Sequence, residues 1–561
     1  MRERLKGAAR PVLERAQHIQ VGSLGALPDV PFNLKVLTEA GIVRPMRPEV
    51  ALRVARELRR WGASPAAGVT MCALRYPDEP MVIDEAGTLT FAQVHSRTNR
   101  LARALARAGV RAGDGVAILA RNHRGFIEAV LAIAKLGANA LMMNTMFSGP
   151  QLAGVVREEG PRALIYDGEF AGLLSRVEGD LVRFVAWGEE GEETGDPSLE
   201  SLIESEPDDS DLEPPERRSN FIILTSGTTG APKGARRTQP ATLSPIAALL
   251  DRIPLRSRER TVIAAPLFHS WGFLHFSIGL SLGSTYVLRR KFDPEATLRM
   301  IAENRAEALV VVPVMMQRIL ELPEATIAAN DTSSLRVTAA SGSALPGPLA
   351  TRWMDTFGDN LYNLYGSTEV AWATIATPAD LRAAPGTAGR PPIGTTVKIL
   401  DAHNREVPPG ETGRIFVANE MLFEGYTGGG SKEMVDGLMS TGDIGYLDEE
   451  GRLFVSGRED EMIVSGGENV FPREVEDLLA EHEAVKEVAV IGVDDEEFGQ
   501  RLKAFVVLRE GQQATEDELK QYVKSHLARF KVPREIVFLD ALPRNATGKV
   551  LKRELRERES A

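Results

Sequence analysis

Cysteine is nearly absent from this 561-residue sequence, which contains Cys72 and no other. A single thiol excludes an internal disulfide framework and a metal site built from several cysteines. This content favours a reducing, cytoplasmic location. Long apolar runs are also missing: residues 1–20 have no uninterrupted apolar core, and the most apolar stretch, 126–143, contains Glu128 and Lys135. The sequence therefore predicts neither a secretory signal nor a membrane-spanning helix.

The sequence also lacks a basic face of the kind that binds nucleic acid, so no nucleic-acid partner is expected. The formal net charge is −12, but residues 189–216 hold 13 acidic residues and no Lys or Arg, which leaves +1 for the remainder. The segment is rich in Pro, Ser and Glu. Such a composition predicts an acidic, solvated surface insert that contributes little to a buried core.

The length and composition indicate a soluble protein with at least two domains, since 561 residues exceed one compact core and 43% are hydrophobic. Residues 1–74 are expected to form a helical extension. Residues 1–20 place apolar side chains at nearly helical spacing, interrupted by Pro11, and residues 48–61 repeat the pattern. The first of these segments is expected to pack on the body of the protein, with peripheral contact to a membrane left open.

From Thr90 onward the sequence alternates between helical and strand-like patterns. Thr90 and Gln93 form a capping-box pair, and Gly109 closes the helix that follows. A helix is expected at 126–136, and strands are expected at 115–120, 163–166, 221–224, 261–264 and 309–312. This rhythm predicts an α/β fold: a large N-terminal domain of mainly parallel sheets covered by helices, with a β-rich subdomain.

The pattern changes near residue 450, where 446–455 resembles a hairpin and 457–460 a polar connector. Beyond it the sequence predicts a small α/β unit of a normal domain size. Its expected elements are helices from Pro472 and at 516–527, and strands at 485–493, 502–508 and 535–539. We therefore place the domain boundary at Asp460, between an N-terminal domain of residues 1–459 and a mobile C-terminal domain of residues 460–561.

Residues 225–234 form the most distinctive motif, Thr-Ser-Gly-Thr-Thr-Gly-Ala-Pro-Lys-Gly, directly after the apolar run 221–224. Glycines, hydroxyls and Lys233 make a donor-rich loop that suits the oxygens of a nucleotide triphosphate. It is not a Walker loop, because Gly234 follows the lysine where that pattern requires Ser or Thr. A plain surface turn is the alternative, which the length and order of the motif disfavour.

Six more motifs follow this loop in a fixed order. They are Ser-Gly-Ser-Ala-Leu-Pro at 341–346, Tyr-Asn-Leu-Tyr-Gly-Ser-Thr-Glu at 362–369, Ser-Thr-Gly-Asp at 440–443, Gly-Arg at 457–458, Ser-Gly-Gly-Glu-Asn at 465–469 and Pro-Arg-Asn-Ala-Thr-Gly-Lys at 543–549. As a set they resemble the adenylate-forming superfamily, which includes acyl- and aryl-CoA synthetases, peptide-synthetase adenylation domains and firefly-type luciferases. Within it the sequence is most similar to bacterial fatty-acid-CoA ligases.

The resemblance implies a site for ATP and Mg²⁺. Tyr365 can stack on adenine, and Asp443 offers the acceptor oxygens that two ribose hydroxyls require. Glu369 is a hard oxygen ligand for the metal, assisted by Thr225. The residues implied to bind ATP or AMP are Thr225, Ser226, Gly227, Thr228, Thr229, Gly230, Lys233, Gly342, Ser343, Ala344, Tyr365, Gly366, Ser367, Thr368, Asp443 and Arg458.

The resemblance also implies catalytic and acyl-binding residues. The catalytic set is Lys549, Glu369, Thr368 and His269. The ammonium of Lys549 can offset the repulsion between a carboxylate and the α-phosphate that it attacks. His269 lies among apolar residues, where a histidine is ordinarily part of a core, but the resemblance places it near the substrate carboxylate. Trp271, a candidate gate, and Phe273 are implied to line the acyl pocket.

For the second half-reaction the resemblance implies that Ser465, Gly466 and Gly467 bind coenzyme A. In the superfamily this motif and the catalytic lysine lie on opposite faces of the small domain. The domain rotates about a hinge, here Asp460, to present one face and then the other.

The expected activity is that of an AMP-forming ligase. A carboxylic acid and Mg-ATP give an acyl-adenylate, and coenzyme A then displaces AMP. A medium- or long-chain fatty acid is the preferred substrate, because 269–273 and 311–316 are apolar. Aryl and steroid acids, delivery to a carrier protein, a luciferase-like oxygenase and a non-catalytic nucleotide sensor are the alternatives. The sequence leaves a homodimer open.

Overall fold

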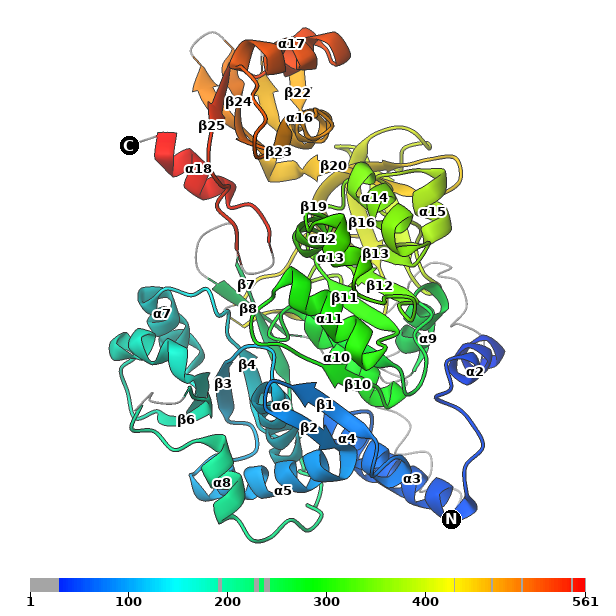
Figure 1. The fold of residues 1–561 in the computed structure, drawn as a ribbon, viewed down its shortest axis with the longest axis vertical. Coiled ribbons are helices and arrows are strands. Elements are labelled where there is room, and N and C mark those ends of the chain that lie inside the picture. Colours follow the sequence, from blue (N-terminus) through cyan, green and yellow to red (C-terminus); the bar gives the residue numbers. More distant parts are fainter. Residues whose placement is uncertain are drawn as a thin grey trace.

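The structure, a computed structural model, describes residues 30–189, 194–226, 232–236, 243–427, 429–465, 468–495, 498–545 and 548–559. Figure 1 shows a large body, coloured blue to yellow, and a smaller C-terminal unit, coloured orange and red, at one end of it. The predicted α/β class, with a large N-terminal domain and a small C-terminal one, is confirmed. Residues 1–29, which include the predicted amphipathic segment, lie outside the described ranges.

The first large sheet has the strand order β14-β13-β12-β11-β9-β10-β1-β2. Its inner pairs are parallel, and the edge pairs β13–β14 and β1–β2 are antiparallel. The strands are β1 (Pro80–Asp84), β2 (Gly87–Thr90), β9 (Arg260–Ile263), β10 (Thr285–Val287), β11 (Ala308–Val311), β12 (Val337–Ala340), β13 (Leu361–Tyr365) and β14 (Thr374–Ala376).

The second large sheet has the order β17-β8-β7-β4-β3-β5-β6, parallel from β7 to β6. Its strands are β3 (Gly115–Leu119), β4 (Asn139–Met142), β5 (Ala163–Asp167), β6 (Val182–Trp187), β7 (Phe221–Ser226), β8 (Pro232–Arg236) and β17 (Gly425–Tyr426). The predicted strand 221–224 thus runs two residues further, and β8 pairs back on it. At the two ends of the phosphate motif, where a loop was expected over 225–234, residues 225–226 and 232–234 lie on strands, and residues 227–231 lie outside the described ranges.

Helices cover and join these two sheets. The helices of the body are α2 (Val30–Glu39), α3 (Pro48–Trp61), α4 (Pro65–Arg75), α5 (Phe91–Arg107), α6 (Arg124–Leu136), α7 (Gly149–Glu159), η1 (Gly168–Arg176), α8 (Leu199–Ser205), α9 (Ser244–Arg252), α10 (Ser270–Leu282), α11 (Pro294–Asn304), α12 (Pro313–Leu320), α13 (Glu324–Ala328), α14 (Gly347–Phe357) and α15 (Pro378–Ala383). The Thr90–Gln93 capping box is present at α5. Helix α3 has the predicted bounds, although Leu58, one of the apolar side chains at helical spacing in residues 48–61, is exposed. No helix of the described ranges is long and apolar enough to cross a membrane.

A β-rich subdomain and the small C-terminal unit complete the chain. The subdomain is an antiparallel sheet of β15 (Thr396–Leu400), β16 (Gly413–Ala418), β18 (Met434–Val435), β19 (Leu438–Leu447) and β20 (Leu453–Arg458). The C-terminal unit, after η2 (Glu459–Glu461), contains β21 (Ile463–Ser465), β22 (Glu468–Val470), α16 (Pro472–Ala480), β23 (Val485–Asp495), β24 (Gly499–Leu508), α17 (Glu516–His526), η3 (Arg529–Lys531), β25 (Glu535–Phe538) and α18 (Lys552–Glu559). It has an apolar core of its own. The boundary at Asp460, inside η2, stays a prediction.

The described part of the acidic segment 189–216 carries mostly exposed acidic side chains, as its composition predicts, but it also contributes to the core. Leu199 and Ile203 of α8 are each only 2% exposed and pack into the main core of the body. The acidic residues that follow pair with a row of arginines on α5. The pairs are Arg97–Glu200 at 2.6 Å, Arg100–Asp209 at 3.6 Å, Arg103–Asp208 at 2.9 Å and Arg107–Glu206 at 2.8 Å. The expectation of little buried core is therefore wrong for this segment.

Candidate active site

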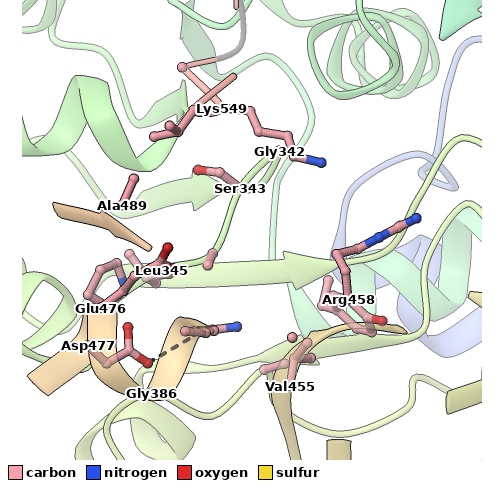
Figure 2. Close-up of a pocket in the computed structure, with 18 of the residues that line it drawn as sticks. Gly342, Ser343, Leu345, Gly386, Val455, Arg458, Glu476, Asp477, Ala489 and Lys549 are labelled. Carbon is pink, nitrogen blue, oxygen red and sulfur yellow. Dashed lines mark ion pairs between the residues drawn. The ribbon is translucent and has the colours of Figure 1, made fainter. Parts of the chain in front are cut away.

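A cavity of about 490 Å³ lies between the body and the C-terminal unit. Residues of five predicted motifs meet there, although more than two hundred positions separate the first motif from the last in the sequence (Figure 2). The predicted residues that line it are Gly342, Ser343, Ala344, Tyr365, Gly366, Ser367, Asp443, Arg458 and Lys549. The carboxyl ends of β12 and β13 supply the first six, as expected for a ligand site at the edge of a parallel sheet.

Tyr365, Asp443 and Arg458 form a linked polar group in this cavity. The Tyr365 hydroxyl donates to Asp443 Oδ2 at 2.6 Å, and Arg458 Nη1 lies 3.5 Å from Asp443 Oδ1. Asp443 and Arg458 are also paired across β19 and β20. Burial raises the pKa of the Asp443 carboxyl, and the Arg458 charge opposes that shift. The carboxylate is thus fixed in place by a donor and a cation, with its edge toward the cavity.

Asn363 is a residue that the sequence analysis passed over. Its side chain lines the cavity and is 6% exposed, and its Oδ1 atom is buried without a hydrogen-bond partner within the described part of the chain. A buried acceptor left unpaired is costly, so it suits a ligand that brings an N–H donor. Alternation along β13 places Asn363 on the same face as Tyr365, and this period-two spacing could have identified it.

The loop that carries Lys549 is fixed by short contacts. Lys549 N–H donates to Asn545 Oδ1 at 2.9 Å, and Asn545 N–H donates to the Lys549 carbonyl at 2.9 Å. Gly548 has φ +77°, and a Cβ there would lie 2.2 Å from Val314 Cγ1 of α12. Only glycine allows both this backbone angle and this approach to the body. The side chain of Lys549 is exposed toward the cavity rather than buried in protein.

Helix α12 and the residue after it also contact the C-terminal unit on the side of the cavity that carries Lys549. Lys486 Nζ lies 3.2 Å from Glu321 Oε2, and Gln317 Nε2 donates to the Lys486 carbonyl at 3.4 Å. In Figure 1 the red segment before α18 descends from the C-terminal unit toward the body.

Ser465 of the predicted coenzyme A motif is buried on β21 and does not line the cavity. Gly466 and Gly467 lie outside the described residues. The structure brings Lys549, and not Ser465, to the cavity.

Glu369 lies in the turn after β13, beside the phosphate hairpin. The Tyr426 hydroxyl donates to Glu369 Oε1 at 2.8 Å, and β17, which carries Tyr426, pairs with β8. Thr368 occupies the same turn. Among the described residues no group of three His, Cys, Asp or Glu side chains could hold a metal ion. A single carboxylate still fits Mg²⁺ that is bound mainly by phosphate oxygens and water.

The phosphate hairpin places part of its motif on strands. Thr225 and Lys233 are paired across β7 and β8, as are Ser226 and Pro232. Gly227, Thr228, Thr229 and Gly230 lie outside the described residues. The backbone of the hairpin therefore brings Lys233 back beside Thr225, although the connecting residues are not described.

Comparison with known proteins identifies the chain. The profile of the AMP-binding enzyme family matches residues 69–427, and that of the AMP-binding enzyme C-terminal domain matches residues 474–549. A fatty acid–[acyl-carrier-protein] ligase, ScoC, of Streptomyces coeruleorubidus is 32% identical over 501 residues, which cover 86% of this chain and 94% of that protein. The chain belongs to the AMP-binding enzyme family.

Two further relatives of this AMP-binding enzyme place it among ligases. An indoleacetate–CoA ligase of Aromatoleum aromaticum is 34% identical and covers 86% of this chain and 94% of its own. The crystal structure of the anthranilate CoA ligase AuaEII in complex with anthranoyl-AMP matches with a TM-score of 0.79 and 27% identity, over 88% of this chain and 97% of that one. The predicted membership of the adenylate-forming superfamily is confirmed.

In this AMP-binding enzyme His269, Trp271 and Phe273, the residues predicted to contact the substrate acid, lie at the start of α10. None of them lines the cavity. His269 occupies the N-cap position, and burial lowers its pKa to about 4, so the imidazole is neutral at physiological pH. Trp271 is 4% exposed, and its Nε1–H donates to the Val311 carbonyl at 3.0 Å. Phe273 packs against Phe221, with ring centroids 5.1 Å apart. This hydrogen bond holds the Trp271 side chain against β11, and its role as a gate stays a prediction.

Proposed function

We propose that this AMP-binding enzyme is an ATP-dependent, AMP-forming ligase of carboxylic acids and coenzyme A. The acid attacks the α-phosphorus of ATP, giving an acyl-adenylate and pyrophosphate. The thiol of coenzyme A then attacks the acyl carbon, and AMP leaves. The observation that carries the proposal is that Lys549 of the C-terminal unit lines the same cavity as Tyr365 and Asp443 of the body. A cation beside a nucleotide site is what the first half-reaction requires, because two anions must meet there.

The cavity suggests how ATP is held. Adenine lies against Gly342–Ala344 and the Tyr365 ring, with Asn363 Oδ1 accepting from its amino group. Asp443 and Arg458 hold the ribose.

The phosphate hairpin, including Ser226 and Lys233, holds the β- and γ-phosphates, and Thr368 contacts the α-phosphate. Mg²⁺, when bound by Glu369 and Thr225, would neutralise phosphate charge. His269, held neutral by burial, orients the substrate carboxylate.

The second half-reaction requires another position of the C-terminal unit. Coenzyme A is proposed to bind along Ser465–Gly467, and Ser465, the described residue of this motif, does not line the present cavity. Rotation about Asp460 would exchange Lys549 for this motif. The side chain of Asp460 accepts from Arg458 Nε at 3.2 Å, so the proposed hinge is attached to the ribose site by one surface contact.

The acid is proposed to be apolar, with a medium- or long-chain fatty acid preferred and an aryl acid as the second candidate. Trp271 and Phe273, in an aromatic cluster of α10, are the proposed wall of the acyl pocket. The names of relatives support both classes: one is a fatty acid–[acyl-carrier-protein] ligase and another an indoleacetate–CoA ligase. ATP–pyrophosphate exchange across octanoate, palmitate, indoleacetate and ferulate tests the choice. Exchange with none of these acids would contradict the proposal.

Delivery to a carrier protein is the competing function, and the ScoC relative supports it. The two functions differ in the acceptor thiol and share the adenylate. The test supplies the preferred acid with either coenzyme A or a phosphopantetheinylated carrier protein and measures thioester formation. Turnover with the carrier alone would replace our proposal by the carrier-ligase function.

A cytoplasmic location, a peripheral membrane contact and a homodimer stay predictions.

A further inference from the structure

Three arginines from distant parts of the sequence converge on one tyrosine, far from the nucleotide cavity. Arg44 follows α2, Arg75 ends α4, and Arg258 precedes β9. Their guanidinium carbons lie 5.0, 5.0 and 5.5 Å from the centroid of the Tyr76 ring. Together with residues 77–79 they line a surface pocket. We call this set, Arg44, Arg75, Tyr76 and Arg258, the arginine pocket. None of its lining residues lines the nucleotide cavity.

The charges of the arginine pocket are only partly compensated. Arg258 forms an ion pair with Glu79. Within the described residues neither Arg44 nor Arg75 pairs with a carboxylate, and the one hydrogen bond of the Arg75 guanidinium, to the Ile42 carbonyl, is 3.4 Å long. Asp78 adds one further negative charge to the lining, so three guanidinium groups face two carboxylates. Like charges held this close repel one another unless an anion lies between them.

The tyrosine supplies a second, independent observation. Tyr76 is 8% exposed, and its hydroxyl is buried without a hydrogen-bond partner among the described residues. Unpaired buried hydroxyls are uncommon, because each forfeits the hydrogen bond that it made to water in the unfolded chain. Because this hydroxyl is enclosed, a ligand oxygen reaches it only if the ring or its cover moves on binding, and the guanidinium groups are the donors that the open pocket presents.

The backbone holds these groups in place. Tyr76 caps α4, and its N–H donates to the Cys72 carbonyl at 2.7 Å. Arg258 adopts φ +67°, a conformation that non-glycine residues rarely take, and its N–H donates to the Leu282 carbonyl at 3.0 Å. The next residue back, Ser257, donates its N–H to the Ala40 carbonyl at 2.7 Å, which ties the turn to the α2 connector. The pocket is therefore built before any ligand arrives.

We propose that the arginine pocket is a second anion site that binds a phosphate group, independent of the nucleotide cavity. Guanidinium forks recognise phosphate oxygens through paired, charge-assisted hydrogen bonds. A tetrahedral dianion presents oxygens in several directions, which matches guanidinium donors that arrive from three parts of the chain. A planar carboxylate, with one charge and two oxygens, would leave part of this set unpaired. The phosphate belongs either to a small soluble phosphate compound or to a lipid headgroup.

The experiment titrates inorganic phosphate into the full-length protein at constant ionic strength, with a saturating acyl-sulfamoyl-adenosine, which carries no phosphate, present to occupy the nucleotide cavity. Calorimetry should detect one binding event. Arg44→Gln and Arg75→Gln should each weaken it about tenfold or more, on the scale of losing one charged hydrogen-bond donor. Tyr76→Phe, which keeps the ring, should weaken it less. Arg53→Gln, at an exposed position of α3 outside the pocket, is the matched control.

A second arm identifies the source of the phosphate. The same variants are sedimented with vesicles that contain phosphatidic acid, whose headgroup is a phosphate monoester, or with vesicles of phosphatidylcholine alone. Binding of inorganic phosphate that depends on Arg44 supports a soluble ligand, and binding to phosphatidic acid vesicles alone, with the same dependence, supports a lipid headgroup. If the wild-type protein binds neither, or if Arg53→Gln loses as much binding as Arg44→Gln, the proposal is wrong. Circular dichroism of each variant separates lost binding from lost folding.

Discussion

At the scale of single residues, the hydrogen bond from Tyr426 to Glu369 links the proposed metal ligand to the phosphate hairpin. One carboxylate oxygen, Oε1, accepts the hydroxyl at 2.8 Å, which limits how the group can rotate. Tyr426 is paired with Ala235 of β8, so Glu369 is connected to the hairpin through this contact. Residues that orient a metal ligand commonly affect metal affinity almost as strongly as the ligand does.

We predict that Glu369→Gln lowers adenylation by about 10²-fold or more, because the charge that holds Mg²⁺ is lost while the shape is kept. Tyr426→Phe should raise the Mg²⁺ concentration needed for half-maximal rate by about tenfold. ATP–pyrophosphate exchange across a Mg²⁺ titration measures both. Tyr446→Phe removes a hydroxyl from β19 as a control. Unchanged exchange by Glu369→Gln at limiting Mg²⁺ would show that another group binds the metal.

His275 is a residue that no proposed function uses. It is 2% exposed, neither ring nitrogen has a partner in the described part of the chain, and it packs edge-on against Trp271 at 4.5 Å. Burial lowers its pKa from 6.5 to about 3. Between these values the unfolded chain binds a proton that the folded one does not, so this histidine makes the protein less stable as the pH falls below about 6.5.

We therefore predict that His275→Met stabilises the protein, by about 1–2 kcal/mol at neutral pH, because an unpaired polar group is replaced by an apolar one of similar size. The gain should grow between about pH 7.5 and pH 5, since the variant no longer has this acid-sensitive group. Thermal unfolding midpoints at both pH values measure the effect. His403→Gln changes an exposed histidine for comparison. A lower midpoint for His275→Met at both pH values would show that the imidazole has a partner in solution.

At the scale of elements, α8 and the acidic chain after it hold α5 on the body. The arginines of α5 that pair with this chain recur three or four residues apart, so they form one row on the helix surface. The aliphatic side chains of α8 are buried beneath. Glu206, only 1% exposed, pairs with Arg107, which lies in the last turn of α5. The segment is thus a structural cover for one helix.

We predict that Ile203→Ala costs about 2–4 kcal/mol, the usual range for truncating a buried aliphatic side chain. Glu204→Ala, at the exposed next position, should change stability by less than about 0.5 kcal/mol. Urea denaturation of the two variants provides the comparison. Removal of residues 189–216 should accordingly abolish soluble expression instead of leaving catalysis intact. Equal stability of both point variants would mean that α8 contributes nothing to the core.

At the scale of the whole molecule, the position of the C-terminal unit decides which motif reaches the cavity. Among the described residues, the contacts that hold the present position include the Lys486–Glu321 ion pair, the long hydrogen bond from Gln317, the Arg458–Asp460 contact and the close approach of Gly548 to Val314. Interfaces of this kind permit domain motion. One small unit could in this way serve both half-reactions.

We predict that Lys549→Ala suppresses pyrophosphate exchange by about 10²- to 10³-fold, on the scale of losing one well-placed stabilising charge. Supplied with pre-made acyl-adenylate, the same variant should still form the thioester. Gly467→Leu should do the reverse, because a side chain would obstruct the path of the pantetheine arm. Asp460→Pro, which fixes φ at the proposed hinge, should impair the second step more than the first. Equal damage to both half-reactions by Lys549→Ala and Gly467→Leu would contradict the alternation.

The sequence by itself determined the local elements and the family. The periodicity of residues 115–166 and the Thr90–Gln93 capping box predicted elements that the structure contains within a few residues, because short-range hydrogen bonds and alternation fix them. The ordered motifs predicted the adenylate-forming fold. These signals depend on residues that are close together in the chain, and so they can be recognised without coordinates.

Only the tertiary structure decided which distant groups meet. The match between acidic residues 200–209 and the α5 arginines spans about one hundred positions, and composition alone predicted a solvated insert. The unpaired oxygen of Asn363, the hydrogen bond that anchors Trp271, and the convergence of Arg44, Arg75 and Arg258 on Tyr76 likewise have no local signal. The reason is physical: burial and charge pairing depend on which elements pack together. The same local sequence can leave a side chain in solvent or bury it, according to what packs against it.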